Sequence, residues 1–398
     1  MSSLHFASAL STDPDARVAE ERCVATLGAA LVDAPDLLLV FANHHYGEAL
    51  DGLGRRLRAA TGARLLAGCT GGMLIGGARE VEEGPAISIL AARLPGVEVR
   101  AQHILARHDA AEDWTFSAFP ELARPDEGNL LLLADPFTFP MPEFLAFLDG
   151  ELPGVQAVGG MASGGLGPGQ NLLFLDDDVL HYGALALSLE GGVQVRSAVS
   201  QGCRPVGDPY VITSCRDHRI THLRGRKAAG VLLQMLEKLP EGDRRLFRKG
   251  AMVGLAVDAR KRSFDAGDLL ARNIIGLHPK EESIAVTDSS IRAGMTIQFL
   301  VRDAESASVD LKETLATKAR QWNREHLEPQ EVGALLFSCG GRGTRLFRSF
   351  HHDVGCLQEV WGPDLPVAGF FANGEIGPVG GRSFLHGYTA SVALLLPR

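Results

Sequence analysis

The chain is poor in aromatic residues and has no excess of positive charge. Only 6% of its 398 residues are Phe, Trp or Tyr, and 39 basic residues stand against 48 acidic ones, for a formal net charge of −9. This charge disfavours a nucleic acid or an anionic membrane surface as the main partner. No apolar run approaches the roughly 18 residues that a membrane-spanning helix needs. The sequence therefore predicts neither a nucleic-acid partner nor a membrane partner.

The six cysteines form no Cys-x-x-Cys pair. Their spacing excludes a zinc finger and a disulfide scaffold, and it indicates reduced thiols. Since the N-terminus has no basic segment before an apolar core, no signal peptide is expected and the predicted location is cytoplasmic. Two adjacent pairs, His44-His45 and His351-His352, are interpreted as solvated surface because neighbouring side chains point apart. No metal site and no cofactor is predicted.

A strand–loop–helix–strand pattern occurs three times along the chain. The copies begin with the apolar runs 37–41, 130–134 and 334–338, and each run is followed by a loop and by apolar residues at helical spacing. Each copy then has a second strand that leads to a glycine, six residues, an aliphatic residue and another glycine. These endings are Gly68 with Ile75-Gly76, Gly159 with Leu166-Gly167, and Gly369 with Ile376-Gly377.

Pairs of strands joined by short turns follow the first two copies, and such pairs beside a helix crossover favour mixed sheets. The sequence predicts an α/β fold in which mixed β-sheets are flanked by helices and duplicated strand–helix–strand units occur in two related halves. The stretch between copies two and three differs, because strands flank a polar turn at Arg216-Asp217 and a helix starts near Arg226. We place the domain boundary near residue 220, which gives domains 1–220 and 221–398.

The loop after the first strand of copy three is the first candidate site. It comprises Cys339, Gly340, Gly341, Arg342 and Gly343. Glycines before a helix leave backbone N–H groups open to a ligand, and an adjacent guanidinium can hold a carboxylate with two hydrogen bonds. The alternative is a flexible turn with a surface arginine. The loop is neither a Walker A loop nor a dinucleotide-binding fingerprint, because the required spacing is absent.

The second candidate segment contains Asn373, Gly374 and Glu375. Asn-Gly is a strong turn signal, but it does not explain why an acidic residue precedes an apolar one. Glu375 is therefore a candidate to receive an amine or to pair with Arg342. The corresponding turn of copy one, with Cys69 and Thr70, is a candidate third wall of the site.

These segments resemble the FIST sensory proteins, whose name abbreviates "F-box and intracellular signal transduction". The resemblance covers about residues 34–396 and implies a FIST N-terminal-like domain of two repeat units followed by a C-terminal-like domain. It implies an intracellular sensor for small molecules such as amino acids, without a catalytic centre. No F-box or signalling module is recognised, so the output is expected to pass through an unknown protein partner. The family's motif positions correspond here to Cys339, Arg342, Gly343, Gly374, Glu375 and Ile376.

Three hypotheses for the function follow. The first is a small-ligand sensor in which Arg342 holds the carboxylate of an amino acid and Glu375 holds its amine. The second is a cysteine-dependent enzyme that uses Cys339, although no catalytic residue is assigned because no known catalytic motif is present. The third is an interaction scaffold with a vestigial pocket. The first hypothesis requires Arg342 and Glu375 to face one shared site.

Overall fold

A computed structural model describes residues 3–108, 114–120, 122, 129–261 and 263–398. The chain divides into two compact units. Unit 2 consists of Ser200–Leu311 and His386–Tyr388, and unit 1 consists of the remaining segments, Met1–Val199, Lys312–Leu385 and Thr389–Arg398. The predicted sequence domains 1–220 and 221–398 are a different division of the same chain, and their boundary stays a prediction. Among the described residues, no helix is both long enough and apolar enough to cross a bilayer.

The three strand–helix–strand copies predicted from the sequence all form in unit 1. In each copy two parallel strands are joined by a crossover that contains a helix, as parallel strands require. The elements are β2 (Leu37–Ala42), α2 (Leu53–Thr61) and β3 (Leu65–Thr70); β10 (Asn129–Ala134), α3 (Met141–Glu151) and β11 (Gln156–Met161); and β23 (Gly333–Cys339), α7 (His352–Trp361) and β24 (Val367–Ala372).

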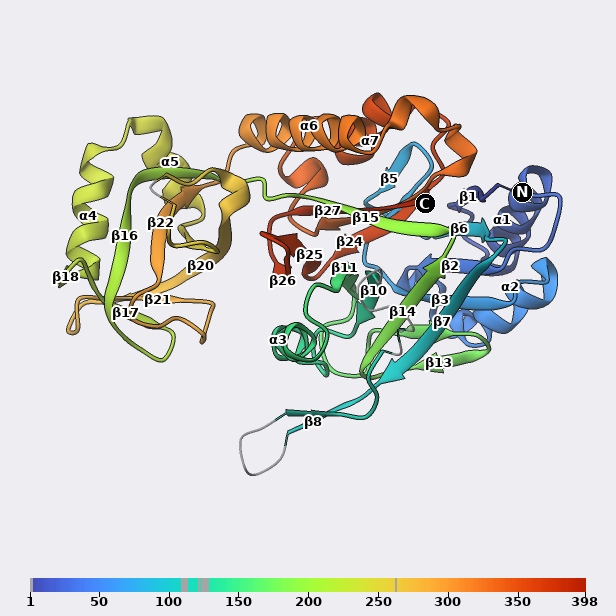
Figure 1. Ribbon diagram of the computed structural model, residues 1–398, viewed down its shortest axis with the longest axis horizontal. Coiled ribbons are helices and arrows are strands. Elements are labelled where there is room, and N and C mark those ends of the chain that lie inside the picture. Colours follow the sequence, from blue (N-terminus) through green and yellow to red (C-terminus); the bar gives the residue numbers. More distant parts are fainter. Residues whose placement is uncertain (1–2, 109–113, 121, 123–128, 262) are drawn as a thin grey trace. The chain divides into compact units, whose positions relative to one another are not determined.

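Each parallel pair lies at the centre of a six-stranded mixed sheet with antiparallel strands on both sides, which confirms the predicted fold class (Figure 1). The strand orders are β1-β6-β2-β3-β12-β13, β7-β14-β10-β11-β25-β26 and β15-β27-β23-β24-β4-β5. The flanking strands are β1 (His5–Ser11), β4 (Leu74–Gly76), β5 (Arg79–Val81), β6 (Ile87–Arg93), β7 (Val97–Ile104), β12 (Leu173–Leu175), β13 (Asp178–Leu180), β14 (Ala184–Gly191), β15 (Val193–Ser200), β25 (Glu375–Val379), β26 (Arg382–His386) and β27 (Ala390–Pro397).

The copies exchange their hairpins in a ring. The hairpin after copy one, β4–β5, pairs with β24 of copy three, whereas β25–β26 of copy three pairs with β11 of copy two. The hairpin of copy two, β12–β13, completes the ring by pairing with β3 of copy one. No copy completes its own sheet, so each of the three sheets contains strands of two copies.

The first glycine of the predicted spacing has the same steric role in each copy. A Cβ on Gly68, Gly159 or Gly369 would lie 1.8, 1.9 or 2.0 Å from a carbonyl oxygen of the neighbouring parallel strand. Only glycine permits this approach, since Cβ atoms do not come so near a carbonyl oxygen.

In copy two, the predicted aliphatic residue and second glycine of the spacing, Leu166-Gly167, do not correspond to those of the other copies. Leu166 is 90% exposed in a loop, and the strand residue that corresponds to Ile75 and Ile376 is Phe174. Copy two has a longer turn between its parallel strand and its hairpin. The abundance of glycine in this turn produced a spacing match without a structural equivalent.

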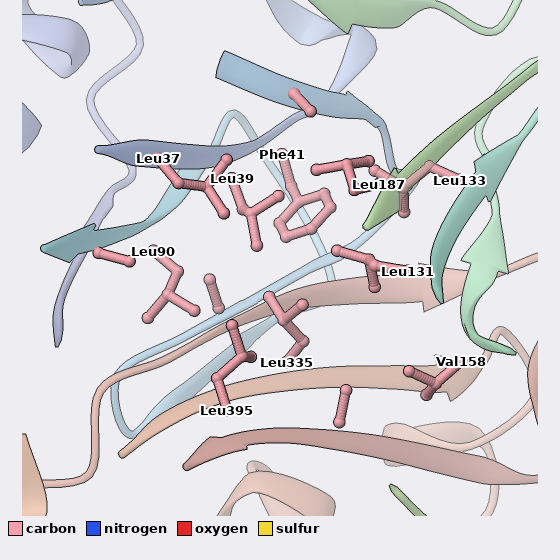
Figure 2. Close-up of a cluster of buried hydrophobic side chains, with 14 of the residues drawn as sticks. Leu37, Leu39, Phe41, Leu90, Leu131, Leu133, Val158, Leu187, Leu335 and Leu395 are labelled. Atoms are coloured by element: carbon pink, nitrogen blue, oxygen red, sulfur yellow. The ribbon is translucent and has the colours of Figure 1, made fainter. Parts of the chain in front are cut away.

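The continuous apolar strands are buried on both faces, as strands of this kind are in α/β proteins. On β2, Leu37, Leu39 and Phe41 join a central core, whereas Leu38 and Val40 pack on the helical side. Figure 2 shows the central core, which includes residues of all three sheets. The outer layer includes α1 (Ala16–Ala30) and α2 on the first sheet and α3 on the second (Figure 1), so the predicted outer helices are confirmed.

Unit 2 has antiparallel strands whose pairing closes on itself, because β16 pairs with both β22 and β17. The predicted hairpin at Arg216-Asp217 joins β16 to β17, and the predicted helix near Arg226 is α4. The elements of this stretch are β16 (Arg204–Arg216), β17 (Arg219–Leu223), β18 (Arg226–Lys227), α4 (Ala228–Lys238), α5 (Glu241–Lys249), β19 (Met252–Ala256), β20 (Leu269–His278), β21 (Ser283–Val286), β22 (Thr296–Val301) and α6 (Ala304–Gln321), the last of which extends into unit 1 along the chain.

Candidate functional site

The loop Cys339–Gly343 lies where β23 ends and leads into the short 3₁₀ helix η5 (Gly343–Arg345). Cys339, Gly340 and Gly341 are half-buried, but Arg342 is 0% exposed. The alternative of a surface arginine on a flexible turn is therefore wrong. Gly343 has a φ of +59°, in the left-handed region, and a Cβ there would lie 2.7 Å from Glu82 Oε1, so this position favours glycine.

The backbone N–H groups expected to cradle a ligand are largely used inside the protein. The N–H of Cys339 donates to the carbonyl of Thr389 at 2.9 Å, and the N–H of Gly340 donates to Ala372 at 3.2 Å. The N–H of Arg342 donates to the carbonyl of Cys339 at 2.8 Å. These N–H groups are thus used within the protein, and the predicted cradle of open amides is wrong for these three groups.

Arg342 holds a carboxylate with two hydrogen bonds, as the sequence suggested, but the carboxylate belongs to Asp353. Arg342 Nε lies 2.6 Å from Asp353 Oδ2, and Nη2 lies 2.9 Å from Oδ1. The hydroxyl of Ser338 also donates to Asp353 Oδ2. Burial alone would raise the pKa of Asp353, but the charge and hydrogen bonds of Arg342 hold that pKa well below its usual range. This edge of the guanidinium therefore has a structural partner.

The other edge of the same guanidinium is different. Arg342 Nη1 is buried and has no hydrogen-bond acceptor among the described residues. An unsatisfied buried donor costs about 1–3 kcal/mol, and such groups are rare in native structures. Phe347 covers part of the guanidinium, with its ring centroid 5.2 Å from the arginine Cζ, and offers no conventional acceptor.

Glu375 is the second buried charge of the site and is also 0% exposed. Its Oε2 accepts hydrogen bonds from the N–H and the hydroxyl of Thr389, at 3.1 and 2.7 Å. Burial would lower the pKa of Arg342, but Asp353 first, and then Cys339 and Glu375, hold that pKa above its ordinary value. The structure therefore brings Arg342, Cys339 and Glu375 within electrostatic range of one another.

Comparison with the other two copies shows that Glu375 is an addition to the scaffold. Glu375 pairs in register with Gly160, and the corresponding strand positions in the other hairpins are Leu74 and Leu173. Both leucines are fully buried in the central core. Because a buried carboxylate is costly unless it is paired, the fold itself favours the leucine.

Two residues that donate hydrogen bonds to these carboxylates, Thr389 and Ser338, are also polar where copy one has an alanine. Thr389 of copy three corresponds to Ala86 of copy one, because the carbonyl of Thr389 accepts the N–H of Cys339 and the carbonyl of Ala86 accepts the N–H of Asn43. Asn43 and Cys339 hold the same position relative to the parallel strand of their copies. Ser338 likewise corresponds to Ala42. Each lies two residues after the residue that pairs with the first glycine of the spacing, Gly369 in copy three and Gly68 in copy one. Polar groups thus replace small apolar ones in copy three alone.

The remaining predicted residues have other surroundings. Cys69 lies in the central apolar core, and burial raises the pKa of its thiol well above the ordinary value. Thr70 Oγ1 accepts the N–H of Leu172 at 3.0 Å, so its hydroxyl is used by the loop of copy two. Asn373 is exposed, and Gly374 has a φ of +136°, as the predicted turn requires.

The sequence did not reveal the residues that support Arg342. The pair His351-His352 is wrongly interpreted as solvated surface, because both residues are half-buried and His352 Nδ1 lies 2.9 Å from Asp353 Oδ1. Glu80 of copy one accepts the N–H groups of Asp353 and Val354 at 2.8 and 2.9 Å. Asp353 lies in the first turn of α7, which follows the loop that carries Arg342. An acidic residue at this place in the sequence is a signal for a partner of that arginine. Nothing in the sequence signals Glu80, because the hairpin exchange places it there.

No group of three or more potential ligand side chains that could hold a metal ion occurs in the described part of the chain. The site contains a guanidinium, carboxylates and hydroxyl groups, together with the thiol of Cys339 and the imidazole of His352. Such a set can bind charged groups of a ligand through hydrogen bonds and ion pairs.

The fold and the site define an α/β protein of three exchanged copies, in which copy three holds the buried side chains of Arg342, Asp353 and Glu375. The sequence matches the FIST N domain over residues 36–226 and the FIST C domain over residues 228–378. Uncharacterised proteins of Mycobacterium bovis and Mycobacterium tuberculosis are each 37% identical over 390 residues, which is 97% of this chain and 97% of theirs. Another Mycobacterium tuberculosis protein is 35% identical over 390 residues, 97% of this chain and 98% of its own. The chain belongs to the FIST family, whose domains are generally sensory or signal-transduction domains.

Proposed function

We propose that this protein is a sensory protein that binds a small ligand, an amino acid, at Arg342 and Glu375. The observation that carries the proposal is the buried Arg342 Nη1, which has no hydrogen-bond acceptor among the described residues. A ligand carboxylate would satisfy this donor, and the half-exposed residues Cys339–Gly341 adjoin it along the chain. The membership in a sensory family supports the same conclusion.

The charges of the site favour a ligand that carries both an anionic and a cationic group. One guanidinium is accompanied by the carboxylates of Asp353 and Glu375. A carboxylate alone would add a third negative group to this buried set, which is unfavourable at low dielectric. The ammonium of an amino acid would offset it by facing Glu375. In the proposed cellular role the protein is cytoplasmic and reports occupancy to a partner protein.

Calorimetric and thermal-shift titrations with the twenty standard amino acids test the proposal. We expect at least one of them to raise the melting temperature, since a ligand at 100 times its Kd stabilises the folded state by about 2.7 kcal/mol. Glu375→Gln keeps the shape and removes the charge, so it should abolish that shift. Glu82→Gln is the matched control, because Glu82 also accepts the N–H and hydroxyl of a threonine, Thr344.

Two results would overturn the proposal. One is the lack of any shift with a folded wild-type protein across the whole series. The other is a shift that Glu375→Gln retains in full. Cys339→Ser separates the sensor from the cysteine-enzyme hypothesis, because a sensor of this kind should still bind its ligand without the thiol.

A further inference from the structure

Glu80 is a buried carboxylate that copy one places beside Asp353. It lies on β5 and is 4% exposed, and it belongs to unit 1, as Arg342 and Asp353 do. The corresponding residue in the hairpin of copy two is Val179, because Val179 pairs with Phe174 as Glu80 pairs with Ile75. Val179 packs against apolar side chains. This position of the hairpin is therefore compatible with valine, and the carboxylate of Glu80 needs another explanation.

One oxygen of Glu80 has a structural role at the start of α7. The side chain of His351, which precedes the helix, makes no cap hydrogen bond to it. Glu80 Oε1 instead accepts the N–H groups of Asp353 and Val354, at 2.8 and 2.9 Å. The first N–H groups of a helix have no partner within the helix, so Oε1 supplies one. The carbonyl oxygen of a neutral carboxyl group or of an amide can accept the same two hydrogen bonds.

The other oxygen of Glu80 has no such role, since Oε2 is buried and has no hydrogen-bond partner among the described residues. His351 Nδ1 accepts the N–H of Glu80 at 3.0 Å, so this nitrogen carries no proton. Burial first, and then the charges of Asp353 and Glu82, raise the pKa of Glu80 to about 7. The titratable and charged groups around Glu80 are Asp353 and His351 at the start of α7, Glu82 on its own hairpin and, in contact with Asp353, Arg342 and His352. Glu80 therefore changes its charge near neutral pH.

A ligand carboxylate at Arg342 would change the charge balance around Glu80. In the protein alone, the positive charge of Arg342 is held by Asp353, through Nε at 2.6 Å and Nη2 at 2.9 Å. A second carboxylate on Nη1 divides this charge between two carboxylates. The proposed partner of the ligand's ammonium is Glu375, so the ammonium does not restore the charge at Asp353. Like charges repel strongly in a buried site, and one of two neighbouring carboxyl groups then keeps a proton.

We propose that Glu80 takes up a proton when a ligand carboxylate binds at Arg342. This role rests on the proposed function, because the ligand supplies the added negative charge. Protonated Glu80 keeps both hydrogen bonds from α7 through Oε1 and no longer repels Asp353. The ligand and the proton therefore strengthen each other's binding, because coupling between two sites is reciprocal. The affinity for the ligand falls as the pH rises, so the protein responds to a ligand together with a proton.

Calorimetric titration of the full chain in buffers with different ionisation enthalpies measures proton uptake on binding. The probes are the twenty standard amino acids and formate, which has a carboxylate but no ammonium. We expect proton uptake near pH 7, where Glu80 titrates. One pKa unit corresponds to a factor of ten, so a rise of one unit on binding makes the affinity at about pH 8.5 roughly sevenfold lower than at about pH 6.

Three variants assign the proton to a residue. Glu80→Gln should bind without proton uptake and with an affinity that does not depend on pH, because the amide oxygen still accepts both N–H groups. Glu82→Gln, the matched control on the same hairpin, should retain the uptake. His352→Gln should retain it as well, since the imidazole beside Asp353 does not carry the proton.

Infrared difference spectra of the wild type keep the test informative where Glu80→Gln does not fold, because a protonated carboxyl group adds a C=O stretch and an imidazolium does not. Amino-acid binding without proton uptake or without this band would overturn the role of Glu80 and leave the proposed function standing. Uptake that a folded Glu80→Gln retains would do the same. Proton-coupled binding of formate alone would instead overturn the amino-acid proposal and leave the role of Glu80 standing. Binding of neither kind of probe would overturn both.

Discussion

Copies two and three end their first strands in different ways, and the difference separates the needs of the fold from those of the site. In copy two, the buried Asp135 accepts hydrogen bonds from Asn171 and Thr138, at 2.9 and 2.7 Å. Both of its carboxylate oxygens are thus used within the protein. In copy three, Arg342 keeps a buried donor without an acceptor among the described residues. A buried polar network that is fully satisfied stabilises a fold, whereas a buried donor without an acceptor needs an explanation, and for Arg342 we propose a ligand.

The largest effects are expected where the three copies are alike. Gly68→Ala, Gly159→Ala and Gly369→Ala each place a Cβ within 2.0 Å of a carbonyl oxygen. Each should lower the free energy of unfolding by more than about 4 kcal/mol, because the backbone of two paired strands has to move apart. Chemical denaturation or the yield of folded protein measures this effect.

A control for this series is Gly150→Ala, since no atom lies within 4 Å of a Cβ at that helix position. It should be neutral or slightly stabilising, because alanine favours a helix. If one of the three strand glycines tolerated alanine as well as Gly150 does, the structural equivalence of the copies would be wrong.

An effect of intermediate size is expected on the pH dependence of the free energy of unfolding. It comes from Glu80 of copy one, which lies beside Asp353 of copy three. Burial first, and then the neighbouring Asp353, raise the pKa of Glu80 from 4.5 to about 7. The folded state therefore holds a proton that the unfolded state has released between pH 4.5 and 7, so this contribution to stability is complete below pH 4.5 and is lost as the pH rises through 7. The expected loss is at most about 3 kcal/mol, since the pKa rises by roughly 2.5 units and each unit corresponds to about 1.4 kcal/mol.

Urea denaturation of wild type and Glu80→Gln across this pH range measures the Glu80 contribution as a difference. The amide oxygen of glutamine can still accept the N–H groups of Asp353 and Val354, but it does not titrate. The difference in the free energy of unfolding should move in favour of the glutamine variant as the pH rises. A difference that stays constant with pH would show that Glu80 does not titrate in this range.

The sequence was a good guide to the scaffold because the scaffold depends on local patterns. Apolar strands, helical spacing and the glycines Gly68, Gly159 and Gly369 all follow from neighbouring residues, and all three copies are present. The hairpin exchange was not predictable, because each hairpin pairs with a strand far away in the chain. This exchange places Glu80 of copy one beside Asp353, so the sequence does not indicate that contact. The contact of His352 with Asp353 is also absent from the sequence prediction, which interprets the histidine pair as solvated surface.

The candidate site was predicted in part. Arg342 and Glu375 do come within electrostatic range, and no such relation is found for Cys69, which lies in the core. The internal partner of Arg342 was missed, because a motif shows that an arginine is present but not which carboxylate it binds. Whether the predicted residues bind a ligand stays a prediction.

The smallest expected change in stability comes from converting copy three to the pattern of copy one. The double variant Glu375→Leu, Thr389→Ala introduces the residues found at Leu74 and Ala86. The double variant removes the buried carboxylate and the hydroxyl that it binds, but it leaves the N–H of residue 389 without that acceptor. The stability should therefore stay within about 2 kcal/mol of the wild type, since apolar replacements of buried charged groups are often tolerated and one unsatisfied donor costs about 1–3 kcal/mol. Amino-acid binding should be lost at the same time.

Denaturation and thermal-shift titration of the same preparation measure both effects. Glu375→Leu alone serves as the control. It leaves the hydroxyl of Thr389 without its acceptor, so it should be less stable than the double variant. A double variant that is far less stable than the wild type would mean that Glu375 supports the fold, and the contrast between copy three and its two relatives would then have a structural cause.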